Sequence, residues 1–233
     1  MSELEGRGRH SMSEMLPLFP LGTVLYPGLL LPLHIFEERY RQLVRDLLEG
    51  PEPQRFGVIA IRKGRETGVD GVSGLYEIGC IATLRQVTEL NDGRFDLVTV
   101  GTQRFRLGQL DDSQPYLRGE VDLLAEDTGD EMAAGLAAQA VQRAFRSYLD
   151  ALARRGVTKV SLPDLPDEPN ALSYLVAATI IVDLSDRQAL LAEPDAASRL
   201  TAERALLSRE TTMLRSLTST PAPDLRCSPY NPN

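Results

Sequence analysis

Few side chains of this 233-residue sequence have the chemistry of a catalytic or metal-binding group. It contains two histidines, His10 and His34, and neither has a cysteine or histidine neighbour at the spacing of a metal-ligand pair. A Ser-His-Asp triad would have to use His34, because His10 lies in a polar leader that cannot hold a base in place. No Gly-x-Ser-x-Gly segment is present. We therefore interpret His34 as a packing or hydrogen-bonding residue and keep a small hydrolase as an alternative.

Nucleotide and peptidase chemistry have equally little support. The glycine-rich segment 64–74 lacks the Gly-Lys-Ser/Thr ending that grips nucleotide phosphates, so we interpret it as a mobile loop. The two lysines, Lys63 and Lys159, do not lie in the apolar surroundings that a Ser-Lys pair needs. The sequence predicts no catalytic residue, no metal and no cofactor.

The formal net charge of −8 at pH 7 argues against a nucleic-acid binder, because basic surfaces supply most of the affinity for phosphates. RNA binding stays an alternative function, supported by a small set of basic residues: Arg62, Lys63, Arg65, Arg104 and Arg106.

The two cysteines are too few for an extracellular disulfide scaffold, and Cys80 is expected to be a small buried apolar residue. The N-terminus has no apolar signal region. No apolar run approaches the roughly 18 residues that cross a membrane. We therefore expect a cytoplasmic protein that does not bind membranes.

The elements that position these groups lie between two polar ends. Residues 1–14 are predicted to be a disordered leader, and the proline-rich residues 218–233 a flexible tail. Between them we expect a β lobe over 15–126 and a helical lobe over 127–217.

In the β lobe, short apolar runs alternate with turn signals, and Glu37–Leu48 is predicted to be helical. Alternation of period two predicts a hairpin around Asn91-Asp92-Gly93, with a kink or bulge at Gly101. Several short strands with one small helix predict a compact, barrel-like sheet. The strands are expected within 16–19, 29–35, 56–61, 76–85, 95–107 and 117–123.

In the helical lobe, apolar residues spaced three and four apart from Met132 through Leu136 to Leu152 predict an amphipathic helix. A nearly all-apolar helix is expected over 171–182. Ser185 and Gln188 fit a capping box for a short helix.

The last helix is expected over 195–217. Leu200, Leu207 and Leu214 recur at heptad spacing and are predicted to be core, with charged residues such as Arg199 and Glu203 on its other faces. Together the two lobes predict an α+β fold: a barrel-like sheet followed by a helical bundle.

The order of these segments resembles the N-terminal domain family of Lon proteases. The opening LPLFPLGTVLYPGLLLPLHIFEERYRQLV is similar to that family's leucine-proline strand, proline-glycine turn and helix start. The similarity continues through FGVIAI and the hairpin, and ends in ALSYLVAATIIVDLSDRQALLAEPDAASRLTAERALL, so that it covers about residues 16–217. In the hairpin the family pattern is matched by Gly79, Ala82, Gly101, Arg104 and Phe105.

The resemblance implies a PUA-like β-barrel followed by a helical lobe. In full-length Lon proteases this region helps to recognise substrates and to assemble a hexamer. Those enzymes continue into a coil, an ATPase module and a Ser-Lys peptidase, which this sequence does not contain. We therefore expect a protein that is not an enzyme, and the resemblance leaves its oligomeric state open.

We expect a recognition module that binds exposed apolar or unfolded polypeptide segments and serves as a proteolysis adaptor for a separate protease. Such a module needs an accessible apolar patch. Each large apolar residue has the alternative interpretation of barrel core. The candidate peptide-binding residues surround the first Pro-Gly turn: Tyr26, Leu29, Leu30, Phe36 and Tyr40.

Overall fold

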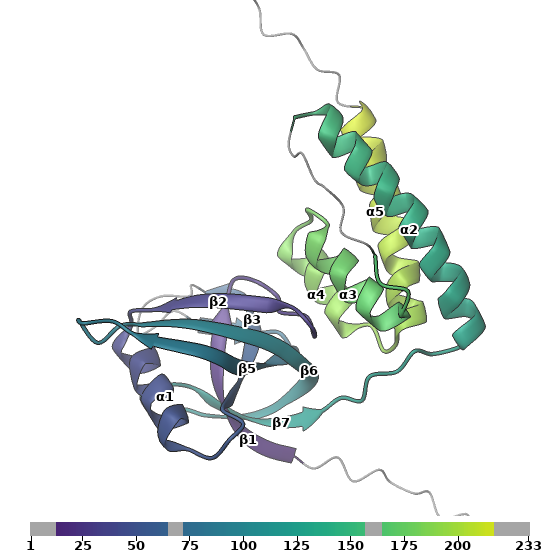
Figure 1. The fold of residues 1–233 in the computed structure, drawn as a ribbon. Helices are drawn as coiled ribbons and strands as arrows, with labels where there is room; N and C mark the ends of the chain where they lie inside the picture. The colour runs from purple at the N-terminus through teal and green to yellow at the C-terminus, as the bar shows by residue number, and fades with distance from the viewer. Residues whose placement is uncertain (1–12, 65–71, 157–164, 217–233) are drawn as a thin grey trace, which may run out of the picture.

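The computed structural model describes residues 13–64, 72–156 and 165–216 (Figure 1). A sheet of mostly antiparallel strands with one short helix comes first, and a group of packed helices follows. This order confirms the α+β class expected from the sequence. The expected tail, 218–233, and residues 1–12 of the expected leader lie outside the described residues.

The strands of the first lobe are β1 (Ser13–Leu21), β2 (Leu30–Ile35), β3 (Arg55–Gly64), β4 (Val72–Leu75), β5 (Ile78–Glu89), β6 (Phe95–Asp111) and β7 (Arg118–Leu123). Neighbouring strands follow the order β1-β7-β6-β5-β3-β4. A parallel pairing of β1 with β3 returns the sheet to its first strand. Five strands therefore form a closed ring, in which each has a partner on both sides.

Strand β6 is long enough to serve two neighbours on one edge. Its second half, residues 105–111, pairs with β7, whereas residues 95–100 pair with β2. Strand β5 runs along its other edge, with a register shift between the Cys80–Arg104 and Ala82–Gly101 pairs. This shift confirms an irregularity at Gly101. Because β6 is its one partner strand in the described chain, β2 stands beside the ring with a second edge that pairs with no strand.

Two elements of this lobe begin or extend differently from the expectation. Ser13 and Glu14, assigned to the leader by sequence, pair with Asp122 and Val121 of β7. Strand β4 overlaps the end of segment 64–74, interpreted from the sequence as a mobile loop, and pairs with β3.

The barrel core consists of two apolar clusters. The cluster at one end contains Phe19, Phe56 and Phe95, and helix α1 (Glu38–Glu49) packs Tyr40 and Leu43 onto it. The other cluster lies around Phe105 and is completed by further buried apolar residues: Leu16, Leu18, Ile59, Ile81 and Val121. Helix α1 is amphipathic, which explains why its periodicity was readable in the sequence.

The second lobe contains helices α2 (Glu131–Arg154), α3 (Pro169–Thr179), α4 (Leu184–Ala192) and α5 (Ala196–Ser216). Helices α2 and α5 lie side by side and run in the same direction (Figure 1). Near their starts the Ala196 amide donates to the Asp127 carbonyl, and near their ends Arg155 Nε donates to the Leu214 carbonyl. The expected boundary at residues 126 and 127 lies in the segment between β7 and α2.

The predicted apolar stripe of α2 is wrong at its start. Met132 and Leu136 are 77% and 63% exposed, whereas the buried face begins with Ala134 and Ala138 and continues through Val141. Small alanine side chains let α5 approach α2 closely. The buried stripe of α2 therefore begins at the alanines and not at the larger Met132 and Leu136.

The boundaries of the next two helices also differ from the prediction. Helix α3 ends at Thr179, and the extended Ile180 and its neighbour lead into α4; the Tyr148 hydroxyl accepts from the Ile181 amide. The N-cap of α4 is Asp183, whose side chain accepts from the Asp186 amide, rather than Ser185. The helix therefore begins two residues earlier than the expected capping box, and the aspartate accepts from the free amide three residues after it.

Buried polar contacts join the two lobes. Arg104 of β6 is 2% exposed; its Nη1 atom donates to the Leu191 carbonyl over 3.0 Å, and its Nε atom lies 3.1 Å from Glu126 Oε1. Across the same interface, the Tyr26 hydroxyl donates to the Arg187 carbonyl, and Gln188 Nε2 donates to the Ile78 carbonyl. These bonds hold the helices against the barrel.

Candidate functional site

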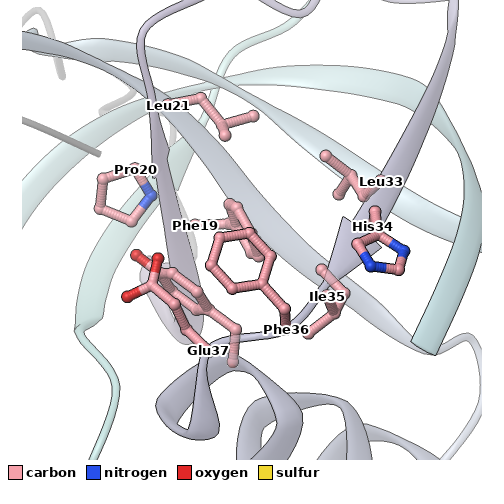
Figure 2. Close-up of a pocket in the computed structure, with 9 residues that line it drawn as sticks. Phe19, Pro20, Leu21, Leu33, His34, Ile35, Phe36 and Glu37 are labelled. Atoms are coloured by element: carbon pink, nitrogen blue, oxygen red, sulfur yellow. The ribbon is translucent and has the colours of Figure 1, made fainter. Parts of the chain in front are cut away.

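An apolar pocket of about 160 Å³ lies between β1, β2 and the start of α1 (Figure 2). Figure 2 shows Pro20 and Leu21 of β1 on one side and Leu33 and His34 of β2 on the other, with Phe36 between them. The residues that line it are Phe19, Pro20, Leu21, Leu33, His34, Ile35, Phe36, Glu37 and Tyr40.

The alternation of β2 supplies one wall. Leu31, Leu33 and Ile35 point towards the barrel cluster, while the alternate residues Leu30, Pro32 and His34 are exposed to solvent. This is the arrangement that a half-buried strand imposes, since successive side chains point to opposite faces. The inward residues of β2 therefore contribute to the core and to the pocket at once.

Aromatic rings form the floor and the rim. Tyr40, in the first turn of α1, stacks on Phe19 with 4.1 Å between ring centroids. Phe36 directly follows β2; its side chain is 55% exposed, and its ring centroid lies 6.3 Å from that of His34. The exposed ring of Phe36 and the adjoining cavity together form an apolar surface that another apolar side chain could contact.

Charged groups surround His34 at the edge of the pocket. His34 Nδ1 lies 2.6 Å from Asp96 Oδ1, and His34 Nε2 lies 3.1 Å from Arg94 Nη1. Because a guanidinium only donates, Nε2 must accept from Arg94, and Nδ1 carries the proton that faces Asp96. Both ring nitrogens are engaged by charged side chains. This arrangement leaves His34 without a free base nitrogen and weakens the hydrolase alternative.

The Arg94 side chain is fixed in turn by Asp92, whose Oδ2 atom lies 2.7 Å from Arg94 Nε. The Arg94 backbone amide, which donates to the Asp92 carboxylate, lowers the pKa of that carboxyl below its ordinary value. On the other side of the rim, Glu37 forms an ion pair of 3.0 Å with Arg39. The charges near the pocket are thus largely paired with one another.

The structure brings together some of the candidate peptide-binding residues. Phe36 and Tyr40 line the pocket, and Leu30 is 67% exposed on the outer face of β2. Leu29 is half-buried between the barrel core and the helical lobe. Tyr26 is only 1% exposed and lies beneath the helical lobe, so it is not placed to contact a peptide.

The sequence interpretation missed the wall formed by Phe19, Pro20 and Leu21. These residues were visible as an apolar strand, but nothing in their local pattern indicated that they face β2. That proximity results from two long-range pairings, β1 with β3 and β2 with β6.

The basic residues proposed for RNA are dispersed. Arg104 is buried and donates to main-chain carbonyls, so it is not available to phosphates. Arg106 is exposed and lies 3.7 Å from Glu77. Arg62 lines a separate cavity of about 330 Å³ beside α4, and Arg65 lies outside the described residues.

Metal and thiol chemistry gain no support from the described part of the chain. Within it, no group of three or more His, Cys, Asp or Glu side chains could hold a metal ion. Cys80 is fully buried in the barrel, and this burial raises the pKa of its thiol. A neutral, enclosed thiol is a packing residue. No described helix is long and apolar enough to cross a membrane.

Comparison with known proteins identifies relatives over most of the chain. The family model described as the ATP-dependent protease La (LON) substrate-binding domain matches residues 15–209. Lon protease 2 of Myxococcus xanthus is 26% identical over 212 residues, which cover 89% of this chain and 25% of that protein. The Lon protease of Escherichia coli strain K12 is 24% identical over 201 residues, covering 86% of this chain and 25% of its own length. The chain thus spans about a quarter of the curated relatives it matches.

Two solved structures share this fold. The Lon N-terminal domain protein from Xanthomonas campestris is 28% identical, with a TM-score of 0.58, and the match covers 84% of this chain and 98% of that one. The N-terminal domain of the Mycobacterium avium complex Lon protease has a TM-score of 0.60 at 18% identity, covering 85% of this chain and 98% of that one.

Proposed function

Because the chain belongs to the ATP-dependent protease La (LON) substrate-binding domain family, we propose that its apolar pocket binds exposed apolar segments of unfolded or partly folded proteins. The observation that carries this proposal is the position of Phe36. Its ring is more than half exposed and adjoins a cavity lined mainly by apolar side chains. Exposed apolar surface of this kind is characteristic of recognition sites.

The binding itself requires no chemical step. The family match covers a substrate-binding domain and not a catalytic one. We propose that the protein acts as an adaptor that holds such segments for a protease. Recognition by apolar contact fits this role, because unfolded proteins share exposed apolar side chains and little else.

The proposal is tested by fluorescence anisotropy with a labelled, permanently unfolded protein at low and high salt. We expect saturable binding with a dissociation constant below about 100 μM, a free energy of about 5–6 kcal/mol. Salt should change the affinity little, because apolar contacts are not screened. No saturable binding in this range would contradict the proposal.

The variant Phe36→Ser tests whether the unfolded protein binds at the pocket. We expect it to weaken binding about tenfold, the loss expected when one partly buried aromatic contact is removed. Leu136→Ser is the matched control, since Leu136 is also more than half exposed but lies on α2 of the helical lobe. Equal losses from both variants would show non-specific apolar adhesion instead of binding at the pocket.

A further inference from the structure

The second edge of β2 pairs with no strand in the described part of the chain and lies beside the pocket. In an antiparallel pair, residues alternate between those that bond to the partner strand and those whose amide and carbonyl point away. The Gly101 amide donates to the Leu29 carbonyl over 2.8 Å, which fixes this alternation for β2 against β6. Leu31, Leu33 and Ile35 therefore bond to β6.

The intervening residues of β2 direct their main-chain groups outward. Leu30 and His34 each present an amide and a carbonyl at the second edge, and Pro32 presents a carbonyl alone. Proline is tolerated in a strand where its missing amide does not face a partner, which agrees with this assignment. An edge of alternating donors and acceptors is a template for another extended chain.

The pocket lies on the face of β2 from which Leu33 and Ile35 project. Side chains opposite one another on neighbouring strands point to the same face of a sheet. A strand added at this edge would therefore direct every second side chain into the pocket. Across the pocket, Pro20 of β1 has no amide hydrogen to donate.

We propose that the polypeptide bound by this protein adds to the free edge of β2 as a short strand, with alternate apolar side chains in the pocket. This inference rests on the proposed function and specifies its substrate: an extended segment in which apolar residues recur at every second position. The main chain supplies affinity that does not depend on sequence, and the pocket selects apolar side chains. A small pocket then suffices for many different substrates.

The test uses a labelled peptide of alternating leucine and threonine with lysines at its ends, and two N-methylated forms of it. One form carries methyl groups on the leucine amides and the other on the threonine amides. A β-strand points successive amides in opposite directions. We therefore expect one form to bind at least about tenfold more weakly than the parent peptide and the other to bind within about twofold.

Methylation of the threonine amides should be the damaging one for an antiparallel peptide, and methylation of the leucine amides for a parallel one. Either result supports the proposal. Equal losses from both forms, or no binding of the parent peptide, would overturn it. If the unfolded protein still binds in that case, the proposed function stands and only the strand geometry is wrong. If neither probe binds, both are wrong.

Two protein variants give an independent check. His34→Pro removes one outward amide without touching the β2–β6 bonds, and His34→Ala removes the same side chain but keeps the amide. We expect His34→Pro to bind the peptide at least about tenfold more weakly than His34→Ala does, because the two variants lack the same side chain and differ in the outward amide. Circular dichroism verifies that both fold.

Equal binding by the two variants would overturn the proposal. The proposal would also be overturned if the parent peptide did not bind and sedimentation showed a concentration-dependent dimer that His34→Pro abolishes. That result would assign the edge of β2 to a second copy of the chain.

Discussion

Glu203 of α5 is a buried acid, and neither of its carboxylate oxygens has a hydrogen-bond partner among the residues that the structure describes. Burial raises the pKa of this carboxyl well above its usual value of 4.5, although the positive charge of Arg199 lowers it in part. Arg199 directs its own donors elsewhere, to the Leu190 carbonyl and the Ser173 hydroxyl. The folded protein therefore binds a proton at Glu203 more tightly than the unfolded chain does.

This difference makes stability depend on pH with a definite sign. Because the pKa of Glu203 is raised in the folded state, its contribution to the free energy of unfolding is fully present below about pH 4.5, the usual pKa of the group. This contribution is lost as pH rises through the folded-state pKa. Each tenfold difference in proton affinity corresponds to about 1.4 kcal/mol.

We predict that Glu203→Gln raises the free energy of unfolding by about 1–3 kcal/mol at about pH 8 and changes it little at about pH 4.5, since the amide has no proton to lose. Urea unfolding at both pH values measures this difference. Glu49→Gln, at an exposed position of α1, is the control and should have a small effect at both. An equal effect of Glu203→Gln at the two pH values would show that its carboxyl does not titrate differently on unfolding.

At the scale of elements, the path of β6 depends on close contact between main chains. A Cβ atom at Gly101 would lie 2.2 Å from the Tyr26 carbonyl oxygen and 3.2 Å from Cys80 Sγ. The Gly101 carbonyl also accepts from the Gly28 amide. This glycine thus lets the turn before β2 pack directly on β6, which sets the start of the strand beside the pocket.

We predict that Gly101→Ala lowers the free energy of unfolding by about 3 kcal/mol or more, because the clash is with main chain and no side chain can move to relieve it. The same change at Gly135, within α2, should stabilise the protein by about 0.5–1 kcal/mol, because beyond the neighbouring backbone of α2 no described atom lies within 4 Å of the added Cβ. Thermal and urea denaturation of the two variants test the pair. A mild effect of Gly101→Ala would mean that the turn before β2 can shift.

At the scale of the whole molecule, Arg104 connects the barrel to the helices. Its guanidinium donates to the carbonyls of Leu191, Glu193 and Pro194 and pairs with Glu126. The Tyr174 hydroxyl also donates to Glu126, which ties α3 into the same network. One buried charge from β6 thereby satisfies main-chain carbonyls in the last turn of α4 and in the segment between α4 and α5.

We predict that Arg104→Met costs about 3–5 kcal/mol, since it leaves Glu126 and these carbonyls without their buried partner. Amide hydrogen exchange should accelerate in α4 and at the start of α5 more than in the barrel. Arg106→Met is the control: its surface ion pair with Glu77 should contribute less than about 1 kcal/mol. If Arg104→Met left amide hydrogen exchange in α4 unchanged, Arg104 would not be what holds α4 against the barrel.

The sequence by itself determined the order and type of most elements. Period-two alternation located β5, β6 and β7, helical spacing located α1 and α5, and the family resemblance joined them into one fold. These signals are local, because a strand or helix repeats its buried face over a few residues. Local signals of this kind also identified two residues that line the pocket, Phe36 and Tyr40.

Only the tertiary structure decided which side chains meet. Arg199 and Glu203 were expected on the faces of α5 outside the leucine core but are fully buried, and Arg104 was a candidate for RNA binding but lies buried between the lobes. A charged side chain can be buried where distant segments supply its partners, as the carbonyls of Leu191, in α4, and Pro194, after it, do for Arg104. The wall of the pocket formed by β1 depends likewise on pairings between strands far apart in the chain. Local periodicity carries no information about such contacts, because it reflects neighbours along one element and not those brought together by folding.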